Sequence, residues 1–431
     1  MTRCAQHVSK SIVPDGAAPD SSTTFKAFVG TRVGERGVRQ LLRLLRHGTV
    51  VLVDGGTERR YGNGLPEARV SVVDKRFYAA TLRHGSVGWG RSYVAGWWEC
   101  DDLTALVQIL ARALAPLGDR ADRIARRAAP LRDALGRLHA SNPALDRDNV
   151  RAHYDLGNDF FELMLDETLA YSCAIFDDPS VSLRHASIAK FDRIATTLNL
   201  GPSDHVVEIG TGWGGFAMHV AARYGCRVTT TTISDAQFEY ASRHVRDAGL
   251  NERVTVVNQD YRTLTGTYDK LVSIEMIEAV GWRQLDTFFS TCAALLTPSG
   301  VMGLQAIVID DRSYDRAKNH EDFIKSQIFP GGFLPSIEAM VRSTSQRTDL
   351  RVIDLEDIGR HYAETLRRWR NNLATHADAV DSLGLGQSFA RLWHLYLCYC
   401  EGAFLERHIS AVQMVLARDA WRGPLATRAR P

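Results

Sequence analysis

A short apolar strand leading into a glycine-rich turn constrains the fold of this chain more than any other feature. Val206 and Val207 precede Glu208 and Ile209, and residues 210–215 then read Gly-Thr-Gly-Trp-Gly-Gly. The next seven residues, 216–222, have a helical pattern. A strand, a glycine-rich turn and a helix in this order are typical of a doubly wound α/β sheet that brings backbone close to a nucleotide. Glycines are needed because side chains would block that approach and because tight turns use positive φ.

The residues around the turn indicate which ligand it would take. Glu208, at the strand end, can accept a hydrogen bond from an ammonium group, which S-adenosylmethionine carries, whereas it would repel the pyrophosphate of NAD. The next predicted strand, residues 227–233, ends in threonines and lacks the acidic residue that binds an NAD ribose. A turn without any ligand and a dinucleotide site are the alternatives. The strand-end residues favour a methyl-donor site.

Strand and helix patterns alternate through a predicted Rossmann-like core at residues 186–310. The predicted strands cover residues 205–209, 227–233, 253–257, 269–275 and 300–308. This alternation predicts an α/β fold with a mostly parallel sheet and helices on both faces. Residues 412–416 are predicted to add an antiparallel edge strand. The segment 311–400 is predicted to be mostly helical, and it contains aromatic residues suited to covering the carboxyl edge of the sheet: Trp369, Trp393, Tyr396 and Tyr399.

The rest of the chain predicts a second, smaller domain. A length of 431 residues suggests two or three domains. We expect a disordered tail at 1–24, an N-terminal α+β domain at 25–140 and the sheet domain at 144–420, with Ser141-Asn142-Pro143 as the boundary. The elements predicted in the N-terminal domain are a basic helix at 37–46, a hairpin around 54–56, strands near 68–74 and 77–82, an irregular aromatic segment at 88–98, and helices at 102–116 and 119–139.

The composition indicates the cellular compartment of the protein and the kinds of partner it would bind. No apolar run approaches the roughly 18 residues that span a bilayer, and the first 20 residues have no apolar signal region. The seven cysteines have no zinc-like or disulfide-like spacing, so we expect a cytoplasmic protein without a metal site. The net charge of +2 gives no bulk attraction to nucleic acid. Arginines nevertheless gather with apolar residues at 32–46 and 120–137, which suits either an anionic membrane surface or solvated helix faces.

Ligands of such sheets bind at the carboxyl ends of the strands. Asp260, after the third strand, could accept from an adenine amino group or only cap a helix. Tyr261 could cover a ring face or be a half-buried core residue. Glu275 and Glu278 follow the fourth strand, where buried carboxylates are costly unless they bind something, the alternative being an exposed loop pair. The remaining strand-end candidates are Glu208, Gly210, Thr232, Ile233, Gln237, Gln259 and Met276.

A set of motifs in a fixed order gives the chain a family resemblance from about residue 150 to 419. The motifs are HYDLGNDFF (153–161), YSCAIF (171–176), VVEIGTGWGGFA (206–217), TTISDAQ (231–237), QDYR (259–262), SIEMIEAVG (273–281), DFIKSQIFPGGFLPS (322–336) and YAETL (362–366). This part resembles the cyclopropane-fatty-acyl-phospholipid synthase family, which includes the mycolic-acid cyclopropane synthases. The N-terminal domain resembles, less sharply, the lipid-associated domain of longer members, best at Gly88–Tyr93.

The resemblance implies an S-adenosylmethionine-dependent C-methyltransferase of the class I Rossmann-like fold with a helical lid. Such enzymes methylate a cis double bond of a phospholipid acyl chain and then close a cyclopropane ring. The pocket must be apolar and closed, because methylation leaves a carbocation that water would quench. We therefore expect a peripheral protein on the inner face of the membrane, with phospholipid as its partner, no nucleic acid, and a homodimer as a further possibility.

The resemblance also implies the site residues. A bound bicarbonate ion is the base in the family, and its ligands correspond here to Cys173, Glu278, Ile307 and Tyr362, with Gln305 in place of the family histidine. The donor site corresponds to Tyr171, Ser172, Gly210, Gly212, Thr232, Ile233, Gln237 and Asp260. Cys400 resembles a cysteine sometimes taken as catalytic, but methyl transfer to an alkene needs no covalent step, so we favour a packed thiol and keep Cys400 only as a candidate.

Two other functions stay open at this stage. A glutamine amide can donate to an anion but cannot titrate, so Gln305 raises the possibility that the cation loses a proton elsewhere. That loss would give a methylene branch, which a partner reductase would convert to a methyl branch. The third possibility is a lipid- or donor-binding protein without turnover, against which Cys173, Glu278 and Tyr362 argue.

Overall fold

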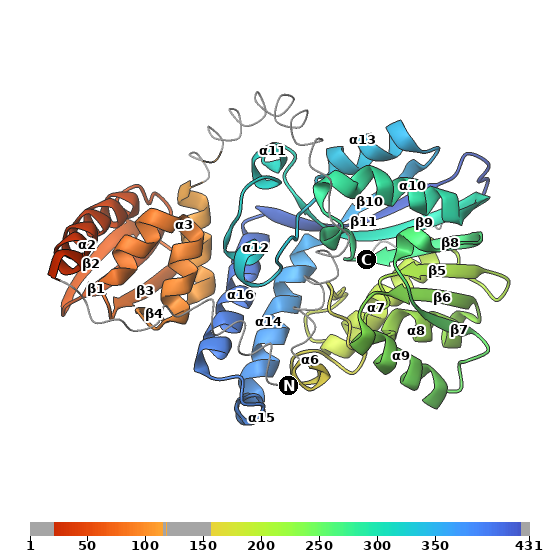
Figure 1. Ribbon diagram of the computed structural model, residues 1–431, viewed down its shortest axis with the longest axis horizontal. Helices are drawn as coiled ribbons and strands as arrows, with labels where there is room; N and C mark the ends of the chain where they lie inside the picture. Colours follow the sequence, from red (N-terminus) through yellow and green to blue (C-terminus); the bar gives the residue numbers. More distant parts are fainter. Residues whose placement is uncertain (1–20, 115–117, 119–156, 424–431) are drawn as a thin grey trace. The chain divides into compact units, whose positions relative to one another are not determined.

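The computed structural model of the protein describes residues 21–114, 118 and 157–423 (Figure 1). The predicted helix at 119–139, the 141–143 boundary and most of the predicted tail lie outside these residues. Contacts group the chain into two compact units. The N-terminal unit combines residues 1–121 with 320–330 and 369–408, and the sheet unit comprises 122–319, 331–368 and 409–431. The domain boundaries expected from the sequence stay a prediction.

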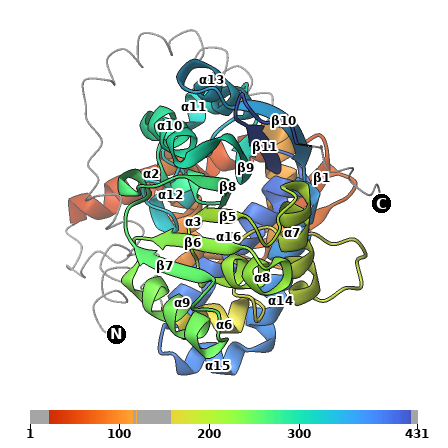
Figure 2. The same ribbon diagram turned by 90° about the vertical axis from the view of Figure 1, so that its right-hand side faces the viewer.

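The sheet unit contains a seven-stranded sheet in the order β10-β11-β9-β8-β5-β6-β7 (Figure 2). Its strands are β5 (His205–Ile209), β6 (Arg227–Thr232), β7 (Val254–Asn258), β8 (Tyr268–Ile274), β9 (Leu296–Ile309), β10 (Arg351–Asp357) and β11 (Ile409–Ala417). Strands β5 to β9 are paired in parallel, while β11 runs antiparallel to both β9 and β10. The predicted Rossmann-like, mostly parallel sheet is confirmed.

The outermost strand on one side was not predicted. The expected antiparallel strand exists as β11, but β10 lies beyond it at the edge. Four of the seven residues of β10 are charged (Arg351, Asp354, Glu356 and Asp357), and most of the strand is exposed or half-buried. An edge strand needs little apolar surface, so its sequence lacks the pattern that identifies buried strands.

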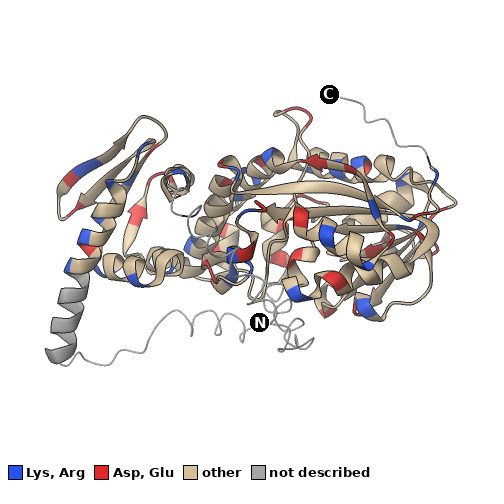
Figure 3. Ribbon diagram, turned by 90° about the horizontal axis from the view of Figure 1, so that it is seen from above, with Lys and Arg blue, Asp and Glu red and all other residues tan. Residues whose placement is uncertain are grey.

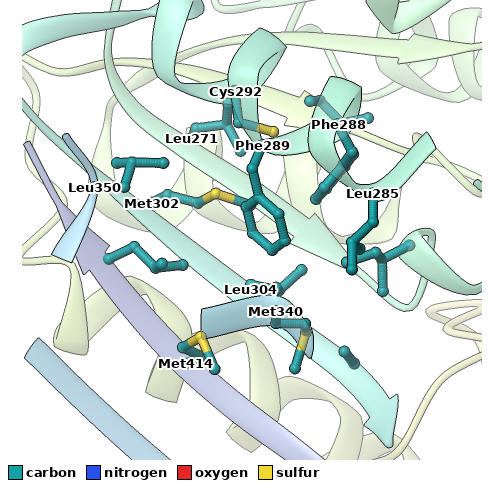
Figure 4. Close-up of a cluster of buried hydrophobic side chains, with 14 of the residues drawn as sticks. Leu271, Leu285, Phe288, Phe289, Cys292, Met302, Leu304, Met340, Leu350 and Met414 are labelled. Atoms are coloured by element: carbon teal, nitrogen blue, oxygen red, sulfur yellow. The ribbon is translucent and has the colours of Figure 1, made fainter. Parts of the chain in front are cut away.

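Helices cover the sheet on both faces, and adjacent strand residues point into opposite cores. Val206 packs with α7 (Leu183–Thr197), α8 (Gly215–Tyr224) and α9 (Asp235–Asp247). Val207 belongs instead to the core formed with α10 (Leu285–Leu295) and α13 (Ile337–Arg347), whose packed phenylalanine and methionine side chains are shown in Figure 4. The unit's shorter helices are α6 (Asn158–Met164), η1 (Tyr261–Thr263), η2 (Ile277–Ala279), η3 (Trp282–Gln284) and α11 (Tyr314–Ala317).

The N-terminal unit has its own four-stranded sheet in the order β2-β1-β3-β4. The strands are β1 (Gly48–Asp54), β2 (Thr57–Asn63), β3 (Glu67–Val72) and β4 (Trp98–Cys100). The unit also contains α2 (Ser21–Leu42), α3 (Arg76–Val94), α12 (Phe323–Gln327), α15 (Ala377–Ser382) and α16 (Gln387–Leu405), and α14 (Gly359–Thr375) contributes its last turns. Residues 103–114 are helical as well, where the sequence predicts a helix at 102–116. The predicted hairpin is confirmed as the antiparallel β1–β2 pair.

Two local predictions in this unit are wrong, because 77–82 is not a strand and 88–98 is not irregular. Residues 76–94 form α3, which is interrupted at Gly85, where φ is +54°. Gly90 allows α3 to pack closely against Phe323, because a Cβ at this position would lie 2.2 Å from the Phe323 ring. Tyr93 and Trp98 then pack with ring centroids 5.0 Å apart.

The aromatic residues expected over the carboxyl edge of the sheet belong by their contacts to the N-terminal unit. There, Trp393 packs edge-on against Tyr396 and Phe323 against Tyr399. None of the helices in the described parts of the chain is long and apolar enough to cross a bilayer.

Candidate active site

The glycine-rich turn lies at the carboxyl end of β5 and leads into α8. Gly210 and Gly212 have φ of +101° and +52°, and Gly214 caps the helix in the left-handed region. A Cβ at Gly210 would lie 3.1 Å from the Met276 Cβ, so a side chain would crowd the next strand's loop. The sequence therefore uses glycine where the backbone needs both positive φ and close approach.

A cavity opens beside this turn, within the sheet unit. Its walls come from the carboxyl ends of four parallel strands, the start of α8 and the loop before α7. All the residues predicted to bind the methyl donor line this cavity: Tyr171, Ser172, Glu208, Gly210, Gly212, Thr232, Ile233, Gln237, Gln259, Asp260, Tyr261 and Glu275. The structure therefore brings together residues that are up to about a hundred positions apart in the chain.

Glu208 is a buried carboxyl in the wall of the cavity. Its side chain is nearly inaccessible, and it accepts a hydrogen bond of 2.5 Å from Thr230 Oγ1. Burial raises the pKa of Glu208 to about 8, against the opposing effects of the Thr230 hydroxyl and the positive charge of Lys190. A cationic ligand next to Glu208 would stabilise the ionised form of this carboxyl, because an adjacent positive charge lowers the pKa of an acid.

Both carboxylate oxygens of Asp260 already accept hydrogen bonds from Arg262, which the sequence did not indicate. Arg262 Nε and a terminal Arg262 nitrogen donate to its two oxygens at 2.9 and 2.6 Å, and the Arg262 backbone N–H donates as well. Asp260 is thus the cap of η1, the alternative role considered for it, and it also lines the cavity. Its neighbour Tyr261 packs edge-on against Phe288 while lining the same cavity.

Glu275 lies where the cavity meets a buried cluster of polar groups. Its Oε1 accepts from the Cys173 backbone N–H at 2.9 Å and from Gln305 Nε2 at 2.8 Å. Its Oε2 accepts from the Tyr362 hydroxyl at 2.5 Å. The backbone of Glu275 has φ of +50°, the left-handed region that side chains rarely adopt. Burial raises the pKa of Glu275 above its usual value, and these three donors and Lys190 offset part of that rise.

Glu278 has a different environment three residues later. Its Oε1 accepts from the Ile307 backbone N–H at 2.5 Å, while its Oε2 is buried without a hydrogen-bond partner. Burial and the nearby Glu275 raise the pKa of Glu278 to about 8. Glu278 is therefore mostly protonated at neutral pH. The alternative of an exposed glutamate pair is wrong for both residues.

The groups that the resemblance assigns to bicarbonate thus all contact these two glutamates or adjoin them. Gln305 also donates to the Cys173 carbonyl at 3.2 Å and accepts from Gln413 Nε2 at 2.9 Å, which fixes the orientation of its amide. The Cys173 thiol is fully buried, and burial together with Glu275 raises its pKa well above the usual value. Cys400 lies on α16 in the N-terminal unit, and it does not line the cavity.

One residue of this cluster was missed by sequence reasoning. Lys190 on α7 is completely buried, and its Nζ donates to Ser172 Oγ at 2.6 Å. Its position on the helix was a usable signal, because Ala186 and Ile194, four residues to either side, place Lys190 on the apolar face. A lysine on the buried face of a helix requires nearby acceptors or negative charge.

Comparison with known proteins agrees with this geometry. Residues 142–414 match the family described as mycolic acid cyclopropane synthetase. The chain is 38% identical to the tuberculostearic acid methyltransferase UfaA1 of Mycobacterium tuberculosis over 78% of its own length and 80% of that protein. It is 35% identical to the cyclopropane-fatty-acyl-phospholipid synthase of Escherichia coli, over 84% of its own length and 91% of that protein.

A solved structure shows the same likeness. The mycolic acid cyclopropane synthase CmaA1, solved in complex with SAH and CTAB, superposes with a TM-score of 0.59 at 30% identity. The match covers 63% of this chain and 98% of CmaA1.

Proposed function

Because the chain belongs to the mycolic acid cyclopropane synthetase family of S-adenosylmethionine-dependent methyltransferases, we propose that it methylates a cis double bond in an unsaturated phospholipid acyl chain, with Glu275 as the proton acceptor. The observation that carries the proposal is the position of the Glu275 carboxylate. It is held by Cys173, Gln305 and Tyr362, three groups expected to hold the base in this family, and it lines the donor cavity.

The cavity suits the methyl donor chemically. Glu208 offers a buried carboxyl to an ammonium group, and the glycine turn leaves backbone accessible beside it. Asp260 and Tyr261 offer an acceptor and an aromatic ring for an adenine. When bound, S-adenosylmethionine supplies an electrophilic methyl group attached to a positively charged sulfur.

In the proposed reaction, the alkene electron pair forms the new carbon–carbon bond while the sulfur–methyl bond breaks. The positive charge moves to the neighbouring carbon of the acyl chain. Glu275 then removes a proton from the new methyl group, and the electrons of that C–H bond close the cyclopropane ring. Burial favours this step, because it raises the pKa of Glu275 and so makes its carboxylate a stronger base.

Bicarbonate is the alternative proton acceptor. It would have to bind next to Glu275 and Glu278, whose oxygens already accept from Cys173, Gln305, Tyr362 and Ile307. A further anion beside a carboxylate is unfavourable in a buried site, because like charges repel strongly at low dielectric. We therefore assign the role of the base to the side chain.

The test is to incubate the protein with S-adenosylmethionine and vesicles of unsaturated phospholipid, and then to measure fatty-acid masses and structures. We expect a mass gain of one CH₂ with a cyclopropane ring, at a rate that does not depend on added bicarbonate. No mass gain would reject the function. A rate that rises with bicarbonate and is lost in its absence would return the role of base to that ion.

The second candidate product is a methylene-branched chain, with a partner reductase completing a methyl branch. Gln305 in place of the family histidine, and the Glu275 side chain beside it, favour this alternative because the position of the base decides which proton is lost. A hydride shift would move the charge to the methylated carbon, and loss of a methyl proton would then give an exocyclic double bond. Both products gain one CH₂ and have the same mass, so mild hydrogenation after the incubation separates them: only the methylene product is reduced to a methyl branch under conditions that leave a cyclopropane ring closed.

We also propose that the N-terminal unit contacts the membrane through the outer face of α2 and the turn after it. Val33, Leu41 and Leu44 are 55%, 40% and 47% exposed on this surface. Arg36 and Arg43 are exposed beside them, which suits anionic headgroups. On the helices of the sheet unit, basic and acidic residues are interspersed (Figure 3).

Vesicle co-sedimentation of the full chain tests this contact. The R36E/R43E variant should bind anionic vesicles more weakly by about thirtyfold or more, since each of the two lost arginines contributes about 1 kcal/mol. The R227E/R246E variant, with the same charge change at exposed positions of the sheet unit, is the control. Equal binding by both variants would show that α2 is not the contact.

A further inference from the structure

Lys190 is a basic residue of the site whose side chain is fully buried. Its ammonium group is completely buried on α7, where desolvation lowers its pKa. The acidic groups around it are Glu275, the Cys173 thiol, Asp166 and Glu208, and the ionised form of each favours the charged form of the lysine. A buried lysine is retained at this cost only when nearby groups compensate it.

Lys190 does not affect the buried carboxyls of the site equally. Its charge opposes the desolvation of Glu275 and of Glu208, whereas the groups that act on Glu278 are Glu275 and backbone donors. Glu275 also receives three hydrogen bonds, while Glu278 has one oxygen without a partner. The arrangement therefore assigns the negative charge to Glu275 and the proton to Glu278.

Lys190 also connects this charge to the donor cavity. Its Nζ donates to Ser172 Oγ, and Ser172 lines the cavity. The next residue, Cys173, donates its backbone N–H to Glu275. One side chain thus orients two consecutive residues, of which one lines the donor site and the other holds the proton acceptor.

We propose that Lys190 is a positioning residue that keeps the Glu275 carboxyl ionised at neutral pH and fixes the Ser172 hydroxyl in the donor cavity. The role of Lys190 in turnover rests on the proposed function, since it presupposes that Glu275 accepts the proton. Its effect on ionisation does not depend on the lipid substrate.

Two neutral variants separate the charge from the hydrogen bond. K190M removes both, while K190Q keeps a donor for Ser172. We expect both variants to lose activity about tenfold or more near pH 6 to 7. Both should approach the wild-type rate near pH 9, because the Glu275 carboxyl then loses its proton even without the lysine charge. K190Q should also keep a donor affinity closer to that of the wild type than K190M does.

The matched control is K318M. The Lys318 side chain is also largely buried, at 4% exposed, and it forms an ion pair with Asp315 at 2.9 Å in the same unit, but it does not line the cavity. Removing it tests whether the loss of any buried lysine changes the pH profile. A purely structural role for Lys190 would lower its rate at every pH, as for K318M.

A second readout does not depend on activity. Infrared spectroscopy of the full chain near neutral pH should show one more protonated carboxyl in K190Q than in wild type, and the band should disappear in K190Q/E275Q. An unchanged carboxyl band together with an unshifted pH profile would overturn the proposal. Failure of the wild type to methylate lipid would reject the proposed function instead, and the infrared result would still decide the role of Lys190.

Discussion

The two halves of the site are built in opposite ways. The donor half consists of a glycine turn, strand ends and short polar side chains around an open cavity. The half around Glu275 is closed, and its side chains bond chiefly to one another. An open half can exchange a ligand at each turnover, whereas a closed half holds one chemical group in a fixed protonation state. The difference predicts that substitutions in the first half change binding and that those in the second half change the rate of chemistry.

The sharpest test of this division is E275Q. The amide preserves the shape but cannot accept the proton, so kcat should fall by about 10²- to 10⁴-fold. The affinity for S-adenosylmethionine, measured by calorimetry, should fall far less than kcat, because the amide keeps the size of the side chain in the cavity wall. E239Q, at an exposed position of α9, is the control and should be unaffected. A nearly normal kcat for E275Q would remove Glu275 from the mechanism.

The converse test is G210A, which should weaken donor binding by about 10- to 100-fold. Gly210 has φ of +101°, and a Cβ there would approach Met276, so the turn must shift. G249A is the matched control, because Gly249 has φ of +67° with no atom near the added carbon. If G249A weakened donor binding as much as G210A, the effect would be general destabilisation rather than loss of the cavity's shape.

Y362F should have a smaller effect on the closed half. It removes one of three donors to Glu275, so the pKa of Glu275 rises and the rate near neutral pH should fall by about tenfold. Y240F is the control, since Tyr240 also donates to a glutamate, Glu162, at 3.2 Å. Steady-state kinetics with saturating donor decide the result. A lower donor affinity with unchanged kcat would contradict the division of the site.

The smallest expected effect is on stability and comes from Glu278. Its pKa is about 8 in the folded protein, above the value of the unfolded chain, so the folded state holds a proton that the unfolded state loses above about pH 4.5. The free energy of unfolding should therefore fall as the pH rises toward 8. In E278Q this fall should be shallower by up to about 1.4 kcal/mol per pH unit.

Thermal unfolding of both proteins between about pH 5 and pH 8 measures the difference. Glu208 has a similarly raised pKa and contributes equally to both, so it cancels in the comparison. Parallel pH dependences would mean that Glu278 is already ionised in the folded protein, and that the assignment of charge to Glu275 alone is wrong.

The strand and turn of the open half could be predicted from the sequence because their signals are local. The strand, turn and helix around Gly210 occupy fewer than about twenty consecutive residues, and their pattern follows from backbone requirements. All the residues predicted for donor binding indeed line one cavity. Asp260 shows the limit of this reasoning, since the sequence could not show that Arg262 occupies its oxygens.

The closed half could be predicted only in part. The spacing of Glu275 and Glu278 marked them as a pair, but their partners come from a loop, from β9 and from α14, and only the fold brings these together. The family resemblance named these partners as ligands of bicarbonate, and their hydrogen bonds to Glu275 are what the structure adds. In the N-terminal unit, residues 320–330 and 369–408 pack with the first 121 residues, a long-range arrangement that no local pattern indicates.

The backbone conformation of Glu275 has a consequence for the stability of the protein. At φ of +50° the backbone conformation is more favourable for a glycine than for a glutamate, so Glu275 carries a conformational strain of about 1 kcal/mol. The same carboxylate accepts three hydrogen bonds, so Glu275→Gly would relieve this strain only by leaving three buried donors without their acceptor. Variants that relax the backbone at this position should therefore melt at a lower temperature than the wild type, and heat resistance should be sought elsewhere in the chain.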